Sequence, residues 1–111
     1  MAFNLPKEAL SPDFSKTLKS NDFNYRSAII SIKGRWNNLD YPRLGYSIPK
    51  HGTKLASRRN RLKRIVKEIF RLKAHLLPPM DLIVLVRKES QDEVLGTNLD
   101  SGFGTLRKFT K

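Results

Sequence analysis

The sequence contains no cysteine, few acidic residues and no long hydrophobic run. Without cysteine, the protein has no disulfides, zinc–thiolate sites, iron–sulfur clusters or thiol catalysis. The longest strongly apolar run, residues 82–86, is far shorter than the roughly 20 residues of a membrane-spanning helix. The first residues include Pro6, Lys7 and Glu8 where a secretory signal would be apolar, so we expect a cytoplasmic protein.

Positive charge is what the chain has in excess, since 22 lysine and arginine residues stand against 10 acidic ones and the net charge is +12. The length of 111 residues suits a single domain, 1–111. Such a charge on one small domain is typical of nucleic-acid binding. An anionic membrane is the alternative partner, because a polybasic amphipathic helix can lie on one. We favour nucleic acid as the partner and expect no membrane, because the apolar residues of the basic segment described next are needed to build the core.

Much of this charge lies between Lys54 and Lys73, a segment with nine lysine and arginine residues and one acid, Glu68. Apolar residues recur through it at the spacing of a helix that buries one stripe. They are Leu55, Leu62, Ile65, Val66, Ile69 and Leu72. The opposite side carries Asn60, Arg64, Lys67 and Arg71, flanked by Arg61 and Lys63. Like charges one turn apart repel by about a few tenths of a kcal/mol per pair, so this row predicts an anionic partner such as phosphate.

The remaining patterns predict a mixed α+β fold, an α/β sandwich with the element order α-β-β-β-α-β-α. Strand-forming residues are enriched at 22–32, which predicts one or two strands, the second at 26–32. They are also enriched at 43–49, which predicts a further strand. Residues 81–87 have the continuous apolar character of a buried central strand, so the basic helix lies in a βαβ crossover. We also expect a first helix from Ser11, a turn at 34–38 and a loop at 90–98. The basic helix should be capped by Thr53 and end by Leu77, and a last short helix should be capped by Asp100 or Ser101.

Three segments of the chain resemble the protein subunit of bacterial ribonuclease P. Residues 43–51 read RLGYSIPKH, residues 56–64 read ASRRNRLKR, and residues 67–71 read KEIFR. The core signature is Arg59-Asn60-Arg61 followed by Lys63-Arg64. The strand at 81–84 and the N-terminal Asp13-Phe14, followed by Leu18, are also similar to the family. Because spacing, order and flanking strands agree, the chain is identified as a member of it.

The resemblance implies a βαβ crossover of left-handed sense, a rare exception to the usual hand. It also implies a ribonucleoprotein endoribonuclease, whose catalytic RNA removes the 5′ leader of precursor tRNA with Mg²⁺ held mainly by the RNA. The protein then supplies no catalytic residue and no metal site, and no obligate protein partner is evident. The RNA-binding residues implied are Arg58, Arg59, Asn60, Arg61, Lys63, Arg64, Lys67 and Arg71, and the leader-binding residues are Phe14, Leu18, Tyr46 and Lys50.

Several alternatives remain open at the level of sequence. A structural RNA-binding protein, such as a small ribosomal protein or an RNA chaperone, would carry the same charge. A nuclease using His51 and His75 as acid and base is disfavoured, because no acidic residue in a matching motif orients either ring. Phe14 and Tyr46 are equally compatible with core packing. Trp36 suits either stacking on a base or covering a sheet edge.

Overall fold

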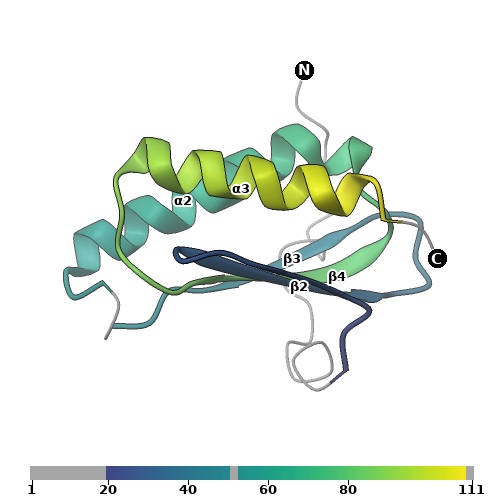
Figure 1. The fold of residues 1–111 in the computed structure, drawn as a ribbon, viewed down its shortest axis with the longest axis horizontal. Helices are drawn as coiled ribbons and strands as arrows, with labels where there is room; N and C mark the ends of the chain where they lie inside the picture. The colour runs from purple at the N-terminus through teal and green to yellow at the C-terminus, as the bar shows by residue number, and fades with distance from the viewer. Residues whose placement is uncertain (1–19, 51–52, 110–111) are drawn as a thin grey trace.

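A four-stranded sheet carries two α-helices on one of its faces (Figure 1). This computed structural model describes residues 20–50 and 53–109, so the first predicted helix, with Phe14 and Leu18, and His51 lie outside the described residues. The elements are β1 (Phe23–Arg26), β2 (Ile30–Trp36), β3 (Arg43–Ser47), α2 (Ala56–Lys73), the 3-10 turn η2 (Ala74–Leu76), β4 (Met80–Val86) and α3 (Asp92–Arg107). The predicted mixed α+β class is confirmed.

The strands lie in the order β1-β2-β4-β3. β3 and β4 are parallel neighbours, whereas β1 with β2 and β2 with β4 are antiparallel. The chain passes from β3 through α2 to β4, so the predicted βαβ unit exists and carries the basic helix. β4 lies inside the sheet, as its apolar sequence predicted. The left hand of the crossover stays a prediction.

The core lies between the sheet and the two helices. Successive strand residues point to opposite faces, and in β4 Leu82, Val84 and Val86 belong to the buried cluster under the helices. The helices contribute fully buried side chains, among them Phe70 of α2 and Phe103 of α3, whose ring centroids are 6.2 Å apart. Each buried side chain of this size stabilises the fold by about 1.5–3 kcal/mol relative to an exposed one.

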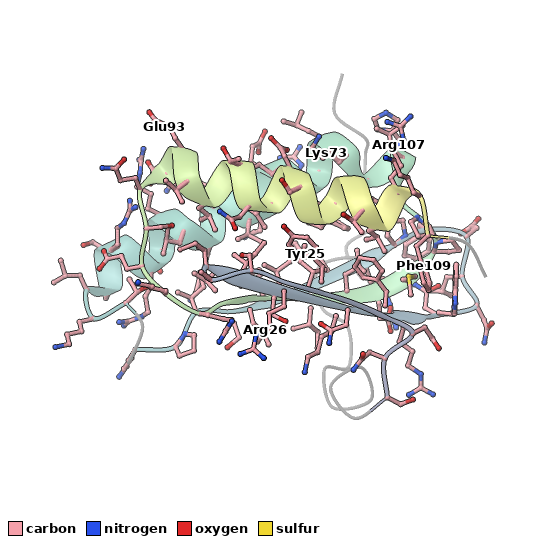
Figure 2. All side chains as sticks on the ribbon, in the orientation of Figure 1. Tyr25, Arg26, Lys73, Glu93, Arg107 and Phe109 are labelled. Carbon is pink, nitrogen blue, oxygen red and sulfur yellow. The ribbon has the colours of Figure 1, made fainter. Side chains whose placement is uncertain are left out.

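Helix α3 approaches the sheet closely at Gly102. A Cβ atom there would lie 2.5 Å from Cδ1 of Ile32 and 3.0 Å from Cδ2 of Tyr25. Figure 2 shows Tyr25 on the side of the sheet that faces α3. Both distances are shorter than van der Waals contact, so the absence of a side chain at 102 sets how near α3 lies to β1 and β2.

The apolar stripe predicted for the basic helix is only partly right. Leu62 and Val66 are fully buried, but Leu55 is 68% and Leu72 49% exposed. Phe70 was left out of the predicted stripe, although it lies four residues after Val66, and it is fully buried. Leu55 precedes the first residue of α2 and Leu72 lies in its last turn, so the exposed positions are the two outermost ones of the stripe. Its end ahead of the two prolines at 78–79 was predicted correctly.

Two predicted boundaries near the basic helix and β2 are wrong. The turn expected at 34–38 is in part strand, because β2 continues to Trp36 with Gly34 paired to both Phe23 and Leu82. Thr53 does not cap α2; the capping position is Leu55, without a side-chain hydrogen bond, and Thr53 is buried. Gly34 is thus held in an extended strand by its two neighbouring strands.

The C-terminal prediction is also wrong, because α3 begins at Asp92 and not near residue 100. The segment 90–98, expected as a loop, forms the first half of this helix. Asp92 and Glu93 suit its first turn, where the helix dipole favours negative charge. Leu95 and Leu99 are fully buried, so tertiary packing offsets the poor helix propensity of the three glycines.

Candidate RNA interface

The eight cationic or amide residues predicted to bind RNA all lie on α2. Four of them are solvent-exposed: Asn60, Arg61, Arg64 and Arg71. The others are half-buried: Arg58, Arg59, Lys63 and Lys67. Glu68 is the one acid of the helix and lies 3.6 Å from Arg71. The outward face of α2 is therefore strongly positive along its length, as the sequence predicted.

Arg59 is bound to its own segment. Its Nη1 donates to the carbonyl oxygens of Thr53 and Lys54, at 3.0 Å and 2.8 Å. These bonds fasten the approach to α2, whose capping residue offers no side-chain hydrogen bond. Arg59 thus has an anchoring role, in addition to its predicted contact with RNA.

Arg58 and Arg61 meet at one carboxylate. Nη1 of Arg58 donates to Oδ1 of Asp92, and Nε of Arg61 donates to Oδ2, both at 2.6 Å. Arg58 also places Nε 3.5 Å from Glu89 Oε1 and donates from Nη2 to the Ser90 carbonyl at 2.5 Å. These contacts join the first turns of α2 to the start of α3.

The two guanidinium groups change the acidity of Asp92. The hydrogen bond from Arg61, followed by that from Arg58, lowers the pKa of Asp92 below its ordinary value of 3.8. Both bonds favour the charged carboxylate. Asp92 is therefore an anion at neutral pH and remains one in moderately acidic solution.

Of the predicted leader-binding residues, Tyr46 and Lys50 lie in the part of the chain that the structure describes. Tyr46 packs against the core, and Nζ of Lys67 lies 6.0 Å from the centre of its ring, within cation–π range. Lys50 is exposed beyond the end of β3. Packing is thus one role of Tyr46. Its leader contact, like that of Lys50, stays a prediction.

A second group of cations lies on the sheet face opposite the helices, and the sequence interpretation missed it. A hollow of about 250 Å³ there is lined by Asn24, Arg26, Ser31, Lys33, Leu85 and Arg87. Figure 2 shows Arg26 on the side away from α2 and α3. The alternation of β2 would have revealed this face, since Ser31 and Lys33 intervene between core residues Ile30, Ile32 and Gly34. Ending the strand at residue 32 concealed it.

Trp36 packs within the protein. Its ring stacks on Phe109 with centroids 5.8 Å apart and planes 23° apart, and Phe109 meets the edge of Phe23 at 5.4 Å. Figure 2 shows Phe109 beyond the end of α3. Of the two roles considered for Trp36, covering the sheet end is the one these contacts support.

The described carboxylates do not assemble a metal site. Asp81 accepts two hydrogen bonds from Arg43, and Asp92 is bound by Arg58 and Arg61. In residues 20–50 and 53–109, no three Asp, Glu or His side chains come together to hold an ion.

Within the described ranges, neither helix has the length and apolar character needed to cross a bilayer.

The architecture and surface define a class: a small α+β protein whose βαβ helix presents cations outward. The family model for ribonuclease P matches residues 9–106, and the chain belongs to this family. The relative from Photobacterium profundum, named ribonuclease P protein component, is 38% identical over 83% of this chain and 78% of its own length. The relative of that name from Photorhabdus laumondii is 56% identical over 53% of this chain. The chain spans about half the length, 50% and 53%, of the first curated relatives it matches.

Solved structures agree with the fold. The RNase P protein from Thermotoga maritima is 27% identical, with a TM-score of 0.73 over 89% of this chain and 93% of its own. The RNase P protein from Staphylococcus aureus, at 23% identity, has a TM-score of 0.78 over 99% of this chain and 100% of its own, a likeness of fold alone. Family and fold thus agree with the resemblance found from sequence.

Proposed function

We propose that this protein is the protein subunit of ribonuclease P and that α2 binds the catalytic RNA. The observation that carries the proposal is the outward face of α2, where Asn60, Arg61 and Arg64 are exposed next to the anchored Arg59. Arginine forks bind phosphate oxygens in pairs, and an amide both donates and accepts towards sugar or base. Solvated helix faces usually mix charge signs, and this one has a single acid.

The precursor tRNA leader has a separate place in the proposal. We infer that it contacts Phe14, Leu18, Tyr46 and Lys50, and that it extends to the cations on the sheet face opposite the helices. The hollow with Arg26, Lys33 and Arg87 supports this extension, because a concave surface lined by cations suits the phosphates of single-stranded RNA. This hollow lies on the face opposite the helices, so the part of the leader bound there leaves the outward face of α2 free for the catalytic RNA.

The chemistry in this proposal belongs to the RNA. Mg²⁺ held mainly by the RNA supplies the metal-dependent hydrolysis, and the protein positions the substrate. The described residues support this division, because Asp81 and Asp92 are already bound by arginines and His75 is exposed without an acidic partner in that part of the chain. We propose no obligate protein partner, no membrane role and a cytoplasmic site of action.

Reconstitution tests the proposal. The protein is mixed with a bacterial ribonuclease P RNA and precursor tRNA in Mg²⁺, and release of the 5′ leader is followed on a gel. At a low Mg²⁺ concentration that leaves the RNA alone slow, the mixture is expected to cleave and the RNA-free protein is not. Copurification with ribosomal RNA and no effect on cleavage would instead support the structural RNA-binding alternative.

A further inference from the structure

Asp92 joins two residues that the family resemblance assigns to RNA binding. Its carboxylate oxygens accept hydrogen bonds from Arg58 and Arg61, each at 2.6 Å. An acid at this place lowers the positive potential of a surface expected to attract phosphate. Its effect on binding therefore depends on what it does to the two arginine side chains.

The two arginines use their donors differently. Arg58 directs all three guanidinium nitrogens at protein groups, Glu89, Asp92 and the Ser90 carbonyl, and its side chain is 21% exposed. Arg61 gives only Nε to Asp92, and its side chain is 61% exposed. In the part of the chain that the structure describes, Nη1 and Nη2 of Arg61 have no partner.

We propose that Asp92 is a positioning residue for RNA binding, which holds the Nε side of Arg61 and leaves the Nη1/Nη2 fork preorganised for a phosphate. A guanidinium has five N–H donors in a fixed plane, so it can serve a carboxylate and a phosphate together. Arg58 ties α2 to the start of α3 and does not contact RNA. This inference rests on the proposed function of α2.

The physical gain is in side-chain entropy. A free arginine loses rotamer freedom when it binds, whereas Arg61 has lost part of it already in the folded protein. This gain opposes the electrostatic loss from the carboxylate. At this position the entropic gain exceeds the electrostatic loss. Whether RNA affinity falls or rises in Asp92→Asn, compared with Glu93→Gln, decides which of the two effects is larger.

Glu93 provides the matched control for Asp92. It is the next residue in the first turn of α3, it is exposed, and Figure 2 shows it at the side of α3 away from the sheet. Asp92→Asn and Glu93→Gln each remove one negative charge from the same helix end, so their effects on net charge and helix dipole match. Among the described residues, only the first of these acids is bound to arginine.

The experiment measures dissociation constants for a bacterial ribonuclease P RNA at one salt concentration. Asp92→Asn is expected to bind about threefold to tenfold more weakly than Glu93→Gln, the range for one side chain that must be ordered on binding. The loss should vanish in an Arg61→Ala background, because the acid then has no fork to position. Asp92→Glu should restore most of the affinity.

Arg61→Lys keeps the test decisive if Asp92→Asn fails to fold, which circular dichroism reports. Lysine keeps the charge but has one ammonium and no fork, so it is expected to bind several times more weakly than the wild type. Equal or tighter binding by Asp92→Asn than by Glu93→Gln overturns the positioning role. The positioning role is also overturned if Asp92→Asn still weakens RNA binding in the Arg61→Ala background, or if Arg61→Lys binds RNA with wild-type affinity. A wild-type protein that does not bind this RNA overturns the proposed function itself.

Discussion

Arg43 and Asp81 form a two-point ion pair across the parallel strands β3 and β4. Nε and Nη2 of Arg43 donate to Oδ1 and Oδ2 of Asp81, at 2.6 Å and 2.5 Å, and the side chains are 25% and 13% exposed. The two residues are also register partners. Asp81 accepts a further bond from Asn37, so one carboxylate joins the loop after β2 to both strands of the βαβ unit.

Asp81→Asn should therefore destabilise the protein by about 1–3 kcal/mol, because a neutral amide replaces the charged acceptor of both hydrogen bonds from a mostly buried guanidinium. Thermal melting measures the effect. Asp40→Asn is the matched control, since Asp40 is exposed and should change the melting temperature little. Equal shifts for the two variants would mean that lost surface charge, and not the pair, is responsible.

Gly102→Ala should destabilise the protein by about 1–3 kcal/mol, because α3 must move away from Ile32 and Tyr25 to admit a methyl group. Gly104→Ala, two residues later in the same helix, meets no atom within 4 Å. It should stabilise the protein by about 0.5–1 kcal/mol through helix propensity. Chemical denaturation of both variants measures the difference, and a stabilising Gly102→Ala would contradict the close approach of α3.

Replacing Arg61 and Arg64 together with alanine should weaken binding to the RNA subunit and leave the circular dichroism spectrum unchanged. Both side chains are exposed on α2, so their loss removes phosphate contacts and no core packing. The slope of log affinity against log salt should become shallower by about 0.7–0.9 per lost phosphate contact. Arg107→Ala with Lys108→Ala removes the same charge at the far end of α3. If that control lost as much affinity, net charge rather than the α2 surface would explain binding.

Phe14→Ala should weaken precursor tRNA binding by about 1–3 kcal/mol relative to mature tRNA, the value for one lost base stack. Only the precursor has a leader, so affinity for the RNA subunit should barely change. Dissociation constants for both tRNA forms, measured beside a thermal melt, check this. An equal loss for both forms, with a lower melting temperature, would assign Phe14 to the core.

The ion pairs of Asp92 predict a pH dependence. The pKa of Asp92 is lowered in the folded protein, chiefly by Arg61 and then by Arg58, so its stabilising contribution is fully present above its ordinary value of 3.8. That contribution should be lost as the pH falls through the lowered pKa. The wild type should thus melt above Asp92→Asn at neutral pH, and the difference should shrink below about pH 4. A difference that is the same at pH 3 as at pH 7 would contradict the ionic origin.

The sequence by itself determined the basic helix, the βαβ unit around it, the buried β4 strand and the family. The helix and the strands depend on local periodicity and apolar runs, and the family on the resemblance of the segment at 56–64, all of which the chain displays directly. The start of α3 was missed because its buried face at Leu95 and Leu99 shares the segment with polar and glycine residues. The continuation of β2 was missed because Gly34 looks like a turn until its two strand partners are known.

Only the tertiary structure decided which cations of α2 are already bound. Arg58, Arg59 and Arg61 look equivalent in sequence, yet one turns towards Ser90 and Asp92, one towards the carbonyls before the helix, and one keeps its end exposed. Their partners lie up to 34 residues away along the chain. The cationic sheet face with Arg26 and Lys33 was hidden for a related reason. Which strand face the helices cover depends on where α2 and α3 pack, and that packing is a property of the whole fold.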